Sequence, residues 1–208
     1  MANPDQKQTT SAKTLVPSPK TLSELHLFTM PEGGTDRLNF LTWDTIEVQG
    51  FGEETIEFHG YYAIERQTPS SPDWAEASVD IRMRELSVDG VSKIFGPIHA
   101  SVNDEIGQIS GGQVRSGTTY ANVPDSPKLC QMYGYMKFDL PQLGMTVFNK
   151  DTIQLEHTIT HIPPVGQGGG TRGRVDLPLY RTDDPDGAPV ASLKQVRTHI
   201  GAWLEDKQ

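Results

Sequence analysis

The stretch Asp151–Pro164, DTIQLEHTITHIPP, alternates between apolar and polar residues with a period of two. This period is typical of a β-strand with one buried face, because successive side chains of a strand point to opposite sides. The β-branched Thr-Ile-Thr between its two histidines favours a strand over a helix. The stretch therefore predicts a strand whose apolar face points at a core or a cavity and carries Leu155, His157, Ile159 and His161.

The same alternation recurs along the chain, most clearly in residues 54–66, 74–88 and 130–140. The 20 glycines and 15 prolines of the 208 residues separate these runs with turn signals. No segment repeats, and strands do not alternate with helices. We therefore predict an all-β protein, a single-domain antiparallel β-barrel or β-sandwich of about nine to eleven strands over residues 21–208.

Three local features complete this prediction. Residues 1–20 are polar and contain three prolines, which predicts a flexible N-terminal tail. Residues 189–204 fit a strand through Ile200, with a short C-terminal helix as the alternative. The Asp89-Gly90 pair predicts a two-residue hairpin turn, followed by a strand on which Phe95 points outward.

The alternation of residues 74–88 changes phase near Arg84 and Glu85. A β-bulge at this point would explain the change, because a bulge inserts one extra residue into a strand. The alternative is an inward-facing Glu85. In that case the interior would gain a carboxyl group that could work together with the histidines.

Charge and cysteine content indicate the compartment and the partners. The net charge of −9 should repel phosphate backbones and anionic membranes, so we expect no nucleic-acid and no membrane partner. No apolar run is long enough to span a bilayer, and the N-terminal residues lack the apolar core of a signal peptide. The single cysteine, Cys130, opens an apolar alternation and is expected to be a buried thiol. A cytoplasmic location fits these features.

The sequence predicts neither a metal nor a cofactor. Along a strand, His157 and His161 stand about 13 Å apart, so one metal ion cannot bind both. The segment Gly168–Gly173 has the spacing of a dinucleotide-binding loop but precedes a strand-like segment instead of a helix. Arg172 and Arg174 of this loop could still bind an anionic group of a ligand.

These observations favour a protein that binds a small organic ligand, and that acts on it as a cofactor-independent isomerase, cyclase or lyase. His157, His161 and Glu85 are the candidate proton-transfer groups, and Tyr62 and Met136 are expected to line the pocket. A non-catalytic interaction or assembly module and a metal-dependent β-barrel enzyme are the alternatives. Enzymatic activity and a homo-oligomeric state both stay open at this point.

Overall fold

The structure is a computed structural model, and it describes residues 31–72, 77–116 and 127–203. The expected tail at 1–20 and a first strand expected at 22–30 lie outside these residues. The described strands form one antiparallel sheet of β1 (Gly34–Val48), β2 (Gly52–Arg66), β3 (Val79–Ser92), β4 (Gly96–Val102), β5 (Gly111–Ser116), β6 (Lys128–Gly134), β7 (Met136–Leu140), β8 (Met145–Asn149), β9 (Ile153–Ile159), β10 (Gly168–Gly170), β11 (Leu177–Arg181) and β12 (Ala191–Trp203). A 3₁₀ turn, η1 (Pro141–Leu143), connects β7 to β8. Among the described residues, no helix is both long enough and apolar enough to cross a membrane.

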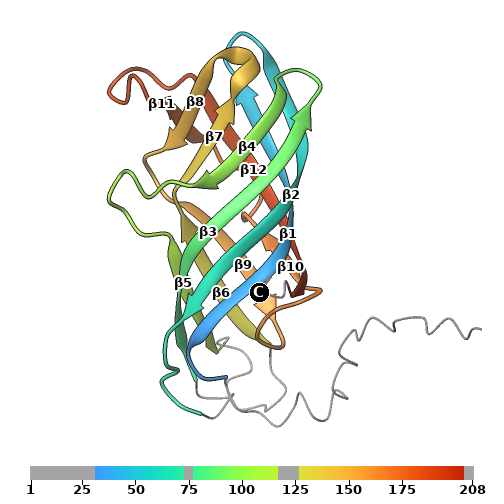
Figure 1. Ribbon diagram of the computed structural model, residues 1–208, viewed down its shortest axis with the longest axis vertical. Coiled ribbons are helices and arrows are strands. Elements are labelled where there is room, and N and C mark those ends of the chain that lie inside the picture. The colour runs from blue at the N-terminus through green and yellow to red at the C-terminus, as the bar shows by residue number, and fades with distance from the viewer. Residues whose placement is uncertain (1–30, 73–76, 117–126, 204–208) are drawn as a thin grey trace, which may run out of the picture.

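The sheet closes into an elongated barrel that branches along its length (Figure 1). The strands β1, β2, β3 and β12 are shared by both halves. One half of β3 pairs with β4 and the other with β5, while β12 pairs with β11 at one end and β10 at the other. The upper half closes through β4, β7, β8 and β11, and the lower half through β5, β6, β9 and β10. Each half is thus a ring of eight strands, which is narrow enough for side chains to fill.

The side chains that fill the interior are those that the alternation of apolar and polar residues predicts to point inward. On β2, Ile56, Phe58, Tyr62 and Ile64 are all buried. Gly60 occupies the remaining inward position, because a Cβ atom there would lie 2.0 Å from the Ser87 carbonyl oxygen on β3. The prediction of an all-β fold is confirmed, and the barrel is the form adopted.

The two halves meet at a seam where β6 leads into β7 and β8 leads into β9. The buried side chain of Asn149 satisfies the backbone at this point. Its amide oxygen accepts from the Met136 N–H at 2.6 Å, and its NH₂ group donates to the Gly134 and Asp151 carbonyls at 2.9 and 2.7 Å. The strand predicted over 130–140 is therefore two strands, because the chain changes partner at Tyr135.

The predicted hairpin turn at Asp89-Gly90 is wrong, because both residues lie within β3. Gly90 serves packing instead: a Cβ atom there would lie 2.8 Å from the Phe58 ring. The turn lies between Ser92 and Gly96, and the Ser92 hydroxyl accepts from the Phe95 N–H at 2.7 Å. Phe95 is consequently fully buried and does not point outward.

The predicted bulge is confirmed. Ala63 pairs with Glu85 and Ile64 pairs with Met83, so Arg84 is the extra residue. An inward Glu85 is therefore wrong, since its side chain is 56% exposed beside Arg37 on the outer face. Residues 191–203 form the strand β12, as preferred over a helix.

Candidate functional site

The two histidines of the opening stretch do not share one face. His157 lies on β9, points into the barrel and is 3% exposed. His161 lies beyond the end of β9, in a turn. There its Nε2 lies 3.1 Å from the Val165 carbonyl oxygen, and its Nδ1 accepts from the Gln167 amide at 2.8 Å. The prediction that the two histidines share a strand face is wrong, because the strand ends at Ile159, two residues before His161.

His157 lines a small space in the lower half, which we call the lower cavity. Burial lowers the pKa of His157 to about 4, so the ring is neutral at neutral pH. Its Nε2 lies 3.5 Å from the Thr198 hydroxyl oxygen on β12. The lower cavity, of about 20 Å³, is lined by Tyr62, Ile64, Arg66, Ile81, Val114, Cys130, Met132, His157, Ile159, Ile162, Pro164 and Ile200. The predicted Tyr62 thus lies with His157. Cys130 is buried as expected, and burial raises the pKa of its thiol to about 12.

The lower half contains a buried ion pair. Asp36 on β1 is fully buried, and its carboxylate accepts two hydrogen bonds from the Arg66 guanidinium, at 2.6 and 3.1 Å. The Arg66 side chain is itself only 10% exposed. This ion pair compensates the charge of the buried Asp36, and Arg66 lines the lower cavity.

A second space, which we call the central cavity, lies at the level of the seam. It is lined by Phe40, Thr42, Asp44, Met83, Leu86, Val88, Ala100, Met132, Tyr133, Gly134, Met136, Phe138, Ile153, Leu155, Leu193, Val196 and Thr198. Phe40, Met136 and Leu155 point inward and yet keep accessible surface. The volume of about 40 Å³ admits water but is too small for an organic molecule. Binding of such a molecule requires the lining side chains to move, and three of them are flexible methionines.

The central cavity contains one ionisable group that sequence reasoning missed, Asp44. It is 4% exposed, and burial raises the pKa of its carboxyl to about 7, although a hydrogen bond from Thr42 opposes the rise. The signal for it was present: Leu38, Phe40, Thr42, Asp44, Ile46 and Val48 have the same parity along β1. Two polar residues in the middle of an inward-facing apolar set indicate an interior polar site. The predicted Met136 lies in this cavity, apart from Tyr62 and His157.

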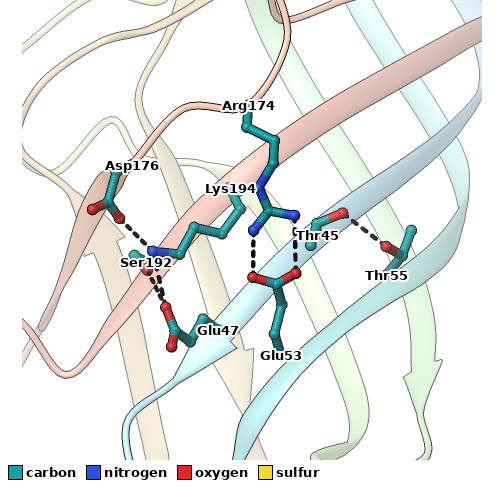
Figure 2. A network of polar contacts seen from close by, with 8 residues as sticks. All are labelled: Thr45, Glu47, Glu53, Thr55, Arg174, Asp176, Ser192 and Lys194. Atoms are coloured by element: carbon teal, nitrogen blue, oxygen red, sulfur yellow. Dashed lines mark hydrogen bonds and ion pairs between the residues drawn. The ribbon is translucent and has the colours of Figure 1, made fainter.

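The remaining candidate residues lie on the outside of the barrel. Arg172 pairs with Glu156, and Arg174 forms a double hydrogen bond with Glu53 at 3.0 and 2.5 Å. Figure 2 shows this pair beside a second group, in which Lys194 bridges Asp176 and Glu47 at 2.6 and 2.9 Å. Ion pairs thus hold the loop that carries both arginines against β9 through Glu156 and against β2 through Glu53, and Asp176 joins it to Lys194 on β12. In this arrangement both guanidinium groups are occupied by carboxylates of the protein.

A hollow of about 920 Å³ is an open groove on the outer face of the upper half. It contains two exposed histidine–carboxylate pairs, His59 with Glu57 at 2.6 Å and His99 with Asp89 at 2.8 Å. Both histidines face outward, as the alternation predicts. Within the described residues, no three His, Cys, Asp or Glu side chains are arranged to hold a metal ion. We place the candidate site in the central cavity, because there a carboxyl group is removed from water without an ion-pair partner among the described residues.

Fold and site together define a closed β-barrel with an apolar interior that holds isolated polar groups. The chain belongs to the family of unknown function DUF6073, which it matches over residues 11–208. It is also similar to the solved structure of DynF from the dynemicin biosynthesis pathway of Micromonospora chersina. The TM-score is 0.80 and the sequence identity 34%, and the match covers 87% of this chain and 86% of DynF. No curated protein matches the chain.

Proposed function

We propose that the protein binds a small, mostly apolar molecule in the central cavity and transfers a proton on it without a cofactor. The observation that carries this proposal is a single buried carboxyl group, Asp44, in a cavity otherwise lined mainly by apolar side chains. A burial-raised pKa close to neutrality lets the same group accept and return a proton. The similarity to a protein of a biosynthesis pathway is compatible with a small organic substrate.

The reaction needs no other reactant. Ionised Asp44 removes a proton from a carbon atom next to a carbonyl group, which leaves an enolate and neutral Asp44. The neutral acid then returns the proton to the oxygen or to another carbon of the same molecule. The net result is an isomerisation within one molecule, from a carbonyl compound to its enol or to a form with a shifted double bond.

His157 is the second candidate for the same role. It is neutral and buried, but it lies in the lower cavity, where it contacts Thr198. Met132 lines both cavities. The two candidates therefore predict different sites for the bound molecule, and this difference can be tested.

Binding is tested with N-phenyl-naphthylamine, an uncharged apolar probe, and with ¹³C-labelled methionine methyl groups observed by NMR. We expect the probe to shift the signals of Met83, Met132 and Met136, which line the central cavity. Met145 lines the outer groove and is the internal control. Shifts confined to Met145, or no shifts at all, would overturn the binding proposal.

Proton transfer is tested with β-tetralone, an apolar ketone, by following deuterium uptake from D₂O in mass spectra. We expect the protein to accelerate uptake, Asp44→Asn to lose at least tenfold of this acceleration, and His157→Gln to keep it. Loss in His157→Gln alone would assign the chemistry to the lower cavity. Equal uptake with and without protein would overturn the catalytic part of the proposal.

A further inference from the structure

The hydrogen bonds of Asp44 restrict the kind of molecule that the central cavity can take. The Thr42 hydroxyl oxygen lies 2.5 Å from Asp44 Oδ1 and 3.0 Å from the Arg197 carbonyl oxygen. A threonine hydroxyl has one hydrogen, so it can donate to only one of these two acceptors at a time. The geometry becomes fully satisfied when Asp44 is neutral and carries its proton on Oδ1. Asp44 then donates to Thr42, and Thr42 donates to Arg197.

The other carboxyl oxygen, Oδ2, is available to accept a hydrogen bond from a molecule in the cavity. Among the described residues, Thr42 is the one side chain that hydrogen-bonds to Asp44. Oδ2 is also absent from the fully covered polar atoms without a partner, which in the described part of the chain comprise Arg37 Nε alone. It carries no hydrogen when the proton is on Oδ1, and none when the carboxyl is ionised. In both states it presents a hydrogen-bond acceptor to whatever occupies the cavity.

Two further polar side chains lie near Asp44 in the lining of the central cavity. Thr198 lies directly opposite Thr42 on β12, and its side chain also lines the central cavity. Thr42, Asp44 and Thr198 together form a small polar patch on the β1–β12 wall, which we call the threonine–aspartate patch. Most of the remaining lining is apolar. An occupant that is apolar throughout would leave Oδ2 without a partner, at a cost of about 1–3 kcal/mol for a buried polar group.

We propose that the central cavity takes an uncharged, mostly apolar molecule with a hydroxyl group, and that this hydroxyl donates a hydrogen bond to Asp44 Oδ2. Enols and phenols belong to this class of molecule. A cationic amine is disfavoured, because both its charge and that of Asp44 would have to be desolvated in an apolar space. This inference rests on the proposed function and specifies the ligand of the same site.

The test compares three probes of the same ring system, naphthalene, β-naphthol and naphthalenemethylammonium, on the full chain at about pH 6. Affinities are measured from the methyl signals of Met83, Met132 and Met136. We expect β-naphthol to bind about tenfold or more tightly than naphthalene, which corresponds to one buried hydrogen bond. The ammonium probe should bind more weakly than β-naphthol.

Two variants separate the hydrogen bond from simple packing. Asp44→Leu should reduce the preference for β-naphthol over naphthalene to about threefold or less, while Asp44→Asn, which keeps a carbonyl acceptor, should retain most of it. Equal binding of naphthalene and β-naphthol to the wild-type protein would overturn the inference and leave the proposed function intact. Tightest binding of the ammonium probe would overturn it in favour of an ionised Asp44. If none of the probes shifts the three methionines, the proposed function itself fails.

Discussion

The central and lower cavities lie in one barrel, but their buried ionisable groups differ in whether a neighbouring charge compensates them. In the lower half, the buried Asp36 is paired with Arg66, and the buried His157 is neutral. In the central cavity, Asp44 has a threonine as its side-chain partner and, within the described part of the chain, no ion-pair partner. Asp36 and Asp44 point inward from the same strand, eight residues apart. We therefore do not use burial alone to select a candidate functional carboxyl group. The criterion is burial without a compensating charge.

The largest expected effect breaks the compensated pair. Arg66→Met leaves Asp36 as an unpaired carboxylate in the core, which should lower the free energy of unfolding by about 3–5 kcal/mol. Urea denaturation at neutral pH measures this loss. The double variant Asp36→Leu/Arg66→Met removes both charges and should recover most of the stability. A loss below about 1 kcal/mol in Arg66→Met would mean that water reaches Asp36.

The second prediction concerns the uncompensated carboxyl. The pKa of Asp44 is raised from 3.8 to about 7 in the folded protein, so the folded state holds this proton more tightly than the unfolded state does. The resulting stability is fully present below about pH 4 and is lost as the pH rises toward 7, at roughly 1 kcal/mol per pH unit. Asp44→Asn should remove this slope from urea denaturation curves. Asp104→Asn, at an exposed position, is the control and should keep it.

His157 should show the opposite dependence on pH. Its pKa is lowered from 6.5 to about 4, so the unfolded state binds the proton more readily than the folded state. The stability that comes from the neutral ring is present above about pH 6.5 and is lost as the pH falls toward 4, by about 3 kcal/mol in total. His157→Gln should flatten this part of the profile, while the exposed His59→Gln should not. An unchanged profile in His157→Gln would show that the ring is hydrated.

The smallest effect is expected on the outer face. Arg174 forms two hydrogen bonds with Glu53, but its side chain is 60% exposed and the pair is accessible to water. Arg174→Ala should therefore lower the melting temperature only slightly, and the difference from the wild-type protein should shrink in high salt. Thermal unfolding at low and high salt measures both effects. A loss comparable to that of Arg66→Met would show that the loop at 171–176 is essential for the fold.

Alternation of apolar and polar residues was sufficient to predict most of the strands and most of their inward faces. The buried set on β2, the bulge at Arg84 and the inward His157 follow from this pattern. The predicted hairpin at Asp89-Gly90 and the predicted shared face of His157 and His161 were wrong. Both predictions depend on where a strand ends, and the alternation does not indicate this. A strand ends where its partners end, and these are residues far apart in the chain.

The sequence by itself determined that this chain forms antiparallel strands with an apolar interior face, because a period of two is a local property of the backbone. It also carried Thr42 and Asp44 at inward positions of β1. Only the tertiary structure decided that β3 and β12 each serve two neighbours, and that the resulting seam places a cavity beside Asp44. It also decided that an arginine from β2 reaches Asp36 and none reaches Asp44 among the described residues. Strand pairing and charge compensation are relations between distant residues, and no local period encodes them.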